Sequence, residues 1–205
     1  MSEGIRQHKI VFVNGPKKSG KDTAAIIATG SGCNIRHAKY SARLKHMARE
    51  MFRVPFDMFN ELEKSGNNDL KDMPQTIFYG MSWRQLLIWL SEEVMKPKFG
   101  DDIFGKWLRD DLVKPTLTKG TIISDCGFYR ECGPVIKTYG AENCYLLRLH
   151  RPGCDFIGDS RSYIELPELP AANVIDIQNR FELPLFKVQV LKQIDKIFGV
   201  VGREY

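Results

Sequence analysis

The feature that most constrains this chain is a glycine-rich segment, GPKKSGKDT, at residues 15–23. It follows an unbroken apolar run from Ile10 to Val13, which predicts a buried strand, and it precedes residues 22–29, whose composition is helical. In such a strand–loop–helix unit, backbone N–H groups converge on phosphate oxygens, and the helix N-terminus adds partial positive charge. The sequence therefore predicts a phosphate-binding loop.

Within this loop, Lys21 can neutralise the charge that develops on a transferred phosphoryl group. Asp22 occupies the position where such loops usually carry Ser or Thr, whose hydroxyl binds Mg²⁺ directly, and Thr23 can contact a phosphate instead. We therefore expect Mg²⁺ to be held through water or by another carboxylate. The loop residues predicted to bind ATP are Gly15, Lys18, Ser19, Gly20, Lys21, Asp22 and Thr23, and Arg151 joins them from farther along the chain. The residues predicted to hold Mg²⁺, directly or through water, are Asp22 and Asp125.

Apolar strands and amphipathic helices alternate along the rest of the chain. Strands are predicted at residues 8–14, 121–124, 144–149 and 173–177, and helices at 22–29, 41–52, 82–95, 102–114, 134–139 and from 184 onwards. Ser82 and Gln85 form a capping box, and Pro115 is expected to end the helix before it. The pattern predicts a single α/β domain, a P-loop NTPase three-layer sandwich with a central parallel sheet. Residues 56–80 carry a weak pattern that resembles a surface insert more than core.

A carboxylate follows the predicted strand at residues 121–124. Asp125 would therefore lie at the carboxyl edge of the sheet, where open α/β folds bind their ligands. We expect Asp125 to orient Mg²⁺ or to contact the acceptor, and the alternative is an aspartate that only caps the following loop.

Arginines flank a stretch that contains glycine and proline, and they include Arg148, Arg151 and Arg161. Arginines on a mobile loop can close over a triphosphate and stabilise its negative charge. The alternative is a solvated basic loop. Beside a phosphate loop the pattern favours a lid at residues 151–165, with Arg151 and Arg161 as its catalytic candidates.

Three further cations, Arg43, Lys45 and Arg84, lie near the starts of two predicted helices. Side chains and helix dipoles can hold a second phosphate there together, although ordinary surface charge explains any one of these residues. The aromatic residues that can stack on a base, unless the core contains them, are Tyr40, Trp83 and Phe128.

Composition excludes several other classes of protein. No run approaches 18 apolar residues, so no membrane span is expected, and the polar segment Met1–Lys9 lacks a signal-peptide pattern. The five cysteines form no C-x-x-C pair, and the four histidines show no metal spacing. The net charge of +5 is dispersed rather than clustered, so no nucleic-acid partner is expected. These observations favour a cytoplasmic protein that binds small phosphorylated ligands.

These motifs resemble the deoxynucleoside monophosphate kinases of tailed bacteriophages over nearly the whole chain. The segments that carry the resemblance are 15–23, Tyr40–Lys45, Ser82–Leu87, Ile122–Asp125, Arg148–Gly153 and Asp159–Tyr163. The resemblance implies a nucleoside monophosphate kinase fold, ATP and Mg²⁺ as donor, and a deoxynucleoside monophosphate (dNMP) as acceptor in the host cytoplasm. It also implies an acceptor-binding insert at residues 53–81, and it leaves a homodimer and the preferred base open.

At the matching positions, the resemblance implies that Lys21 is the lysine of the phosphate loop and that Lys45 and Arg84 hold the phosphate of the acceptor. It also implies that Arg151 and Arg161 belong to the lid. The segment Asp125–Phe128 departs from the family's D-x-R-F, because Gly127 replaces the arginine. The glycine motif also resembles that of animal phosphomevalonate kinases, which share S-G-K-D. The alternatives are therefore a kinase of another phosphorylated acceptor, such as phosphomevalonate or dephospho-coenzyme A, or a nucleotide-dependent protein that binds nucleic acid or a partner.

Overall fold

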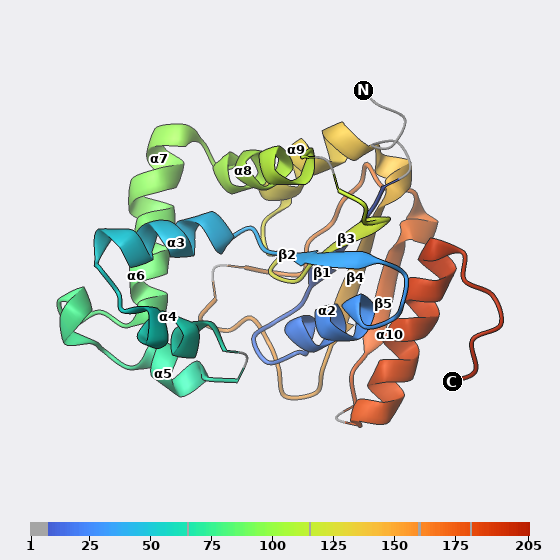
Figure 1. Ribbon diagram of the computed structural model, residues 1–205, viewed down its shortest axis with the longest axis horizontal. Helices are drawn as coiled ribbons and strands as arrows, with labels where there is room; N and C mark the ends of the chain where they lie inside the picture. The colour runs from blue at the N-terminus through green and yellow to red at the C-terminus, as the bar shows by residue number, and fades with distance from the viewer. Residues whose placement is uncertain (1–7, 65, 115, 160, 181) are drawn as a thin grey trace.

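The structure is a computed structural model that describes residues 8–64, 66–114, 116–159, 161–180 and 182–205. At its centre five strands form one parallel sheet in the order β2-β3-β1-β4-β5 (Figure 1). The strands are β1 (Lys9–Asn14), β2 (Ile35–Ala38), β3 (Gly120–Ile123), β4 (Cys144–His150) and β5 (Val174–Gln178). The central strand β1 is apolar on both faces, as a strand covered on both sides must be.

Helices cover both faces of this sheet and give the molecule three layers. On one face Val11 and Val13 pack with α2 (Lys21–Thr29) and α10 (Leu183–Phe198). On the other face Ile10 and Phe12 belong to a larger core. That core includes residues of α3 (Ala42–Met51), α6 (Trp83–Trp89), α8 (Ile103–Leu112) and α9 (Tyr129–Tyr139). The predicted three-layer α/β sandwich with a parallel sheet is confirmed.

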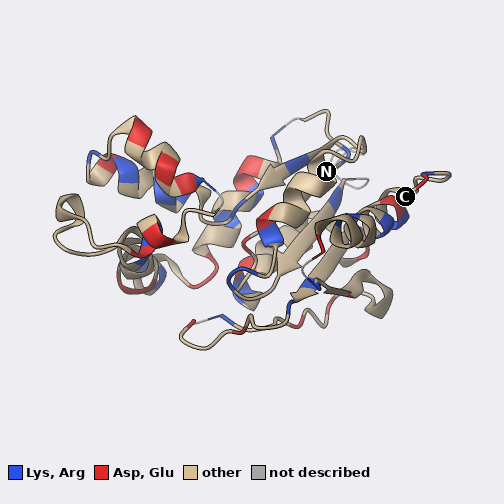
Figure 2. Cartoon of the chain, turned by 90° about the horizontal axis from the view of Figure 1, so that it is seen from below, with Lys and Arg blue, Asp and Glu red and all other residues tan. Residues whose placement is uncertain are grey.

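A helical lobe extends to one side of the sheet, on the left of Figure 1, and contains α3, α6 and several shorter elements. The shorter elements are α4 (Phe56–Glu63), α5 (Asn68–Asp72), the 3₁₀ turn η1 (Thr76–Phe78), the π-helix η2 (Leu90–Met95) and α7 (Lys96–Phe99). Two more 3₁₀ turns, η3 (Ala141–Asn143) and η4 (Ala171–Asn173), precede β4 and β5. Figure 2 shows basic and acidic residues interspersed over these helices.

Most predicted elements are confirmed to within one or two residues, including the capping box at Ser82 and the terminal helix. The prediction for residues 56–80 was wrong, because Phe59, Leu62 and Phe78 are buried in the main core. Strand β2 was missed, since it has four residues with two adjacent polar side chains in the middle, and it lies at the sheet edge.

One further element differs from the sequence predictions, and some residues with predictions lie outside the described ranges. Helix α9 begins at Tyr129 and runs through Pro134, rather than beginning near it. Residues 1–7, Pro115 and Ser160, which belong to the predicted N-terminal segment, helix end and lid motif, lie outside the described residues. Within the described ranges no helix has the length and apolar character needed to cross a bilayer.

The close contact between α8 and α9 depends on Gly105, and a substitution at this position tests it. A Cβ atom at Gly105 would lie 2.2 Å from the carbonyl oxygen of Glu131, so the two helices would have to separate. We expect Gly105→Ala to lower the free energy of unfolding by about 1–3 kcal/mol, although alanine is the better helix former.

Urea denaturation measures this change, and Gly30→Ala is the matched control. Its Cβ would meet nothing closer than 3.4 Å, and the backbone φ of −81° suits alanine. Equal stability of the two variants would contradict the proposed close contact.

Candidate active site

The segment between β1 and α2 forms a tight loop whose shape depends on glycine. Gly20, the residue before α2, has φ 103°, and a Cβ there would lie 2.8 Å from the side-chain nitrogen of Asn179. Lys18 has φ 66°, a left-handed conformation that is uncommon for a residue with a side chain. Left-handed residues in such a loop turn successive N–H groups toward one concavity, which suits an anion.

Polar side chains from two neighbouring strand ends hold this loop in place. After β5, Asn179 donates a hydrogen bond of 2.9 Å to the carbonyl oxygen of Ser19. After β4, Arg151 donates one of 2.8 Å from Nη1 to the carbonyl oxygen of Lys18. The predicted residue Arg151 is therefore beside the loop, and Asn179 was missed. Its place after an apolar strand, at the ligand-binding edge of an α/β sheet, is the signal that could have identified it.

The Lys21 ammonium lies over the loop, where Nζ donates to the carbonyl oxygens of Gly15 at 2.7 Å and Pro16 at 2.6 Å. Burial, together with the nearby Arg161 charge, lowers the pKa of Lys21 to about 8 against the opposing effect of three aspartates. A negatively charged ligand at this position would therefore be favoured by two adjacent cations.

The hydroxyl of Ser19 is the clearest test of whether a phosphate fits the loop. Ser19 is 0% exposed, and its Oγ has no hydrogen-bond partner among the described residues. A buried hydroxyl without a partner is costly, and a phosphate oxygen is an acceptor that would satisfy it. Thr23 lies half-buried in the first turn of α2. These residues fit the triphosphate of ATP.

Asp22 joins α2 to the strand ends on the other side of the loop. Its Oδ1 accepts a hydrogen bond of 2.7 Å from the Ser124 hydroxyl and lies 2.9 Å from Lys39 Nζ. Ser124 is also 2.7 Å from Nε2 of His37. Burial raises the pKa of Asp22, but the Lys39 charge and the Ser124 hydrogen bond outweigh it, so the net shift is downward. Asp22 is therefore an anion at neutral pH.

Asp125 lies next to these groups and accepts hydrogen bonds from backbone and hydroxyl donors. Its two oxygens accept hydrogen bonds from the amide of Tyr40 at 2.8 Å and from the amide and hydroxyl of Ser41 at 3.0 and 2.7 Å. Asp125 thus fixes the turn between β2 and α3. Among the described residues no group of three or more His, Cys, Asp or Glu side chains could hold a metal. A Mg²⁺ that retains waters and phosphate ligands needs only one or two carboxylates, which Asp22 and Asp125 can supply.

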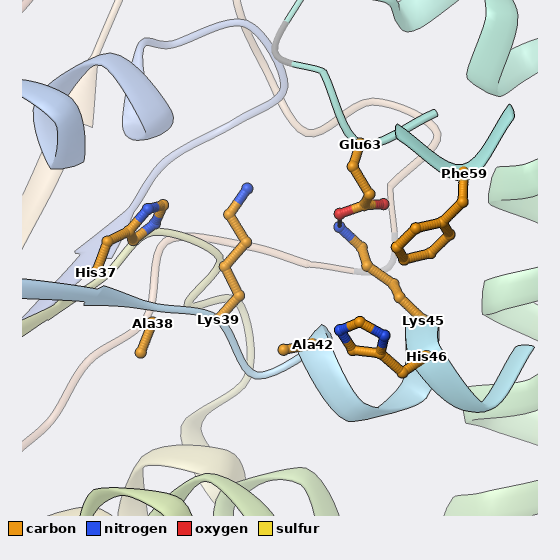
Figure 3. Close-up of a pocket in the computed structure, with 8 residues that line it drawn as sticks. All are labelled: His37, Ala38, Lys39, Ala42, Lys45, His46, Phe59 and Glu63. Atoms are coloured by element: carbon orange, nitrogen blue, oxygen red, sulfur yellow. Dashed lines mark hydrogen bonds and ion pairs between the residues drawn. The ribbon is translucent and has the colours of Figure 1, made fainter. Parts of the chain in front are cut away.

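A cavity of about 310 Å³ lies beside Asp22, and Figure 3 shows the side chains around it. His37 and Lys39 form one side, and Lys45, His46, Phe59 and Glu63 form the other. Lys45 Nζ is 2.7 Å from Glu63 Oε2. The predicted substrate residue Lys45 therefore lines this cavity, and Lys39 connects it to Asp22 on the phosphate loop side.

The other two predicted acceptor cations have different surroundings. Arg84 Nε lies 2.6 Å from Asp72 Oδ1, and Lys17 Nζ lies 2.6 Å from the other oxygen of the same carboxylate. Asp72 thus links α6 to the phosphate loop. Arg43 instead makes a two-pronged ion pair with Asp111 of α8, at 2.8 and 2.7 Å, and it does not line the cavity.

Phe128 belongs to a buried polar cluster that sequence reasoning missed. Lys96 Nζ lies 3.8 Å from the centre of the Phe128 ring, 2.7 Å from Glu92 and 4.0 Å from Glu131. Lys96 is 8% exposed and Glu131 is 4% exposed. Lys96 immediately follows the π-helix η2, a type of distortion that often occurs at functional sites.

No model of a protein family matches the chain, and a search of curated proteins gives no match. A solved sugar kinase from Janibacter sp. HTCC2649 is 14% identical and aligns over 95% of this chain and 96% of its own, with a TM-score of 0.39. A candidate kinase from Chloroflexus aurantiacus j-10-fl is 12% identical over 93% of this chain and 98% of its own, with a TM-score of 0.42. The parallel sheet and glycine loop define the chain as a P-loop α/β protein.

The buried carboxyl of Glu131 gives a pH prediction. Burial raises its pKa from 4.5 to about 8, only partly offset by the Lys96 charge. Between these two pH values the unfolded chain releases this proton and the folded chain retains it. The stabilising contribution of the neutral carboxyl is therefore lost as pH rises through this window.

We expect Glu131→Gln to keep the neutral side chain at every pH and to remove this slope from the free energy of unfolding. Denaturation at several pH values between 4.5 and 8 measures it, with Glu50→Gln as an exposed control. Parallel stability curves for wild type and Glu131→Gln would contradict the assignment.

Proposed function

We propose that this protein is a kinase that transfers the γ-phosphate of ATP to a deoxynucleoside 5′-monophosphate and so produces the diphosphate for DNA synthesis. The observation that carries the proposal is the adjacency of two regions that contain cationic side chains. The phosphate loop with Lys21 is one, and the cavity with His37, Lys39 and Lys45 is the other. They are connected by the ion pair between Lys39 and Asp22.

The donor side is supported by the loop geometry. The N-terminus of α2, the buried Ser19 hydroxyl and the Lys21 ammonium would bind the phosphates of ATP. Arg151, already bonded to the backbone of Lys18, would add a further cation at the same point. Asp22 and Asp125 are the carboxylates that would hold Mg²⁺, and the ion would neutralise negative charge on the phosphates of ATP.

The acceptor side is supported by the charge and shape of the cavity. Its histidines and lysines suit the phosphate of a monophosphate, and Phe59 offers an aromatic wall for a base or sugar. Arg84, at the start of α6, would complete the phosphate contact once its pair with Asp72 is exchanged for the ligand. Several phosphorylated acceptors would suit these side chains, and the resemblance to phage kinases favours dNMP among them. Of the three cations predicted to bind the acceptor, Arg43 has the least support, because its guanidinium is paired with Asp111.

In the proposed reaction, an acceptor phosphate oxygen attacks the γ-phosphorus of ATP in line with the departing oxygen of ADP. A new P–O bond forms to the acceptor as the bond to the β-phosphate breaks, and ADP leaves with the electron pair. Lys21 and Arg161 would donate hydrogen bonds to the γ-phosphoryl oxygens, where negative charge accumulates. The exposed part of segment 151–165 would cover the donor and exclude water that otherwise hydrolyses ATP.

The role proposed for Lys21 predicts a large loss of turnover without a loss of fold. Lys21→Ala removes a cation whose hydrogen bonds to the described residues go only to loop carbonyls, so the core should be unaffected. We expect kcat to fall by about two to three orders of magnitude, as for other groups that stabilise transition-state charge. Lys187→Ala on the exposed face of α10 serves as the control. Near-wild-type turnover of Lys21→Ala with an unchanged melting temperature would reject this role.

The acceptor is identified by an ADP-release assay with dAMP, dCMP, dGMP, dTMP, phosphomevalonate and dephospho-coenzyme A. We expect stimulation by at least one deoxynucleotide and by neither of the other two compounds. Lys45→Ala should then raise KM for that acceptor by about tenfold to a hundredfold, the effect of losing a charged hydrogen bond, and leave KM for ATP unchanged. ADP release without a response to any deoxynucleotide would reject this acceptor class while retaining the kinase.

A further inference from the structure

The side chain of Arg161 passes directly over Gly127, the glycine in the loop after β3. A Cβ atom at Gly127 would lie 2.3 Å from Cδ and 2.8 Å from Cγ of Arg161. These are atoms in the middle of the arginine side chain, so a small rotation of its end would not relieve the clash. The backbone at Gly127 is outside the left-handed region, and alanine is therefore acceptable there apart from this contact. Gly127 provides the space in which Arg161 lies.

The backbone on both sides of this contact is fixed by one buried amide. Asn14, the last residue of β1, is 0% exposed. Its Nδ2 donates to the carbonyl oxygens of Cys126 at 3.0 Å and Ser162 at 3.1 Å, and its Oδ1 accepts from the amide of Ile164 at 3.2 Å. The residues next to Gly127 and next to Arg161 are thus tied to the end of the central strand.

The guanidinium of Arg161 is oriented by a third contact. Asp159 Oδ1 accepts from Nε of Arg161 at 2.8 Å and from its amide at 3.0 Å. Asn14 immediately precedes Gly15, whose carbonyl oxygen accepts from Lys21 Nζ at 2.7 Å, so the backbone beside Arg161 is held next to the loop that carries this lysine. Two cations held together inside a protein repel each other, and an anion placed against both would relieve the repulsion.

From these contacts we infer that Gly127 is a positioning residue, which lets Arg161 reach the γ-phosphate site from a fixed place at the sheet edge rather than from a moving lid. The inference rests on the proposed function for the identity of the anion. It revises the lid predicted for residues 151–165, because Arg161 lies beside backbone that Asn14 holds. The fixed side chain would meet the phosphoryl group without waiting for a loop to close.

A double-mutant cycle between Gly127→Ala and Arg161→Ala tests the inference. Gly127→Ala should lower kcat by about tenfold to a hundredfold, the effect of moving a catalytic group by about 1 Å. Arg161→Ala should lower it at least as much. Once the arginine is absent, the added methyl group has nothing to displace, so the double variant should match Arg161→Ala. Gly30→Ala, with no close contact, is the control for a glycine-to-alanine change.

Multiplicative effects on kcat in the double variant, or wild-type kcat in Gly127→Ala, would overturn the inference. Melting temperatures separate this result from misfolding, since a merely structural glycine would lower stability in both backgrounds. Should wild type phosphorylate none of the deoxynucleotides, the proposed acceptor fails by itself. The affinity of the same variants for ATP is then measured by calorimetry. Additive losses of ATP affinity in the double variant, or no loss of affinity in either single variant, would overturn the placement of Arg161.

Discussion

The buried amide of Asn14, at the end of the central strand, organises the face of the sheet edge that carries the candidate active site. The carboxyl ends of parallel strands meet at one edge of the sheet, so the loops that follow β1, β3 and β4 converge there. Asn14 makes three hydrogen bonds at this edge, to Cys126 after β3 and to Ser162 and Ile164 beyond β4. A buried amide without partners costs several kcal/mol, so the loops and Asn14 stabilise one another.

The sequence predicted the elements whose signals are local. The apolar strand and glycine loop around Lys21 carry their own signature, and the capping box at Ser82 specifies the start of α6 by two reciprocal hydrogen bonds. Segments that depend on distant neighbours were missed. Strand β2 is short and polar, and it is a strand because it pairs with β3 at the sheet edge. Phe59 and Leu62 have a helical pattern too short to separate a core helix from a surface insert.

Helix α9 shows how a local rule can mislead. Proline normally disfavours a helical residue before it, because its ring meets the Cβ atom of that residue. The residue before Pro134 is Gly133, which has no Cβ, so the helix continues through the proline from Tyr129.

The residues of the candidate site also divide into those with a local sequence signal and those without one. Lys21, Asp22 and Lys45 were predictable from motifs, whereas the Lys96–Glu131 cluster and the contact of Arg161 with Gly127 join residues far apart in the chain and leave no sequence pattern.

The charged side chains of the candidate site form ion pairs with one another. Lys45 pairs with Glu63, Arg84 and Lys17 share Asp72, and Lys39 pairs with Asp22. Each pair holds a cation in place and reduces its repulsion from the others, but a bound phosphate must compete with the carboxylate. The pair at Asp22 has the widest consequence, because Asp22 belongs to the phosphate loop region and Lys39 lines the cavity. A serine or threonine there would leave Lys39 without its carboxylate, so this aspartate couples the charge of the loop to that of the cavity.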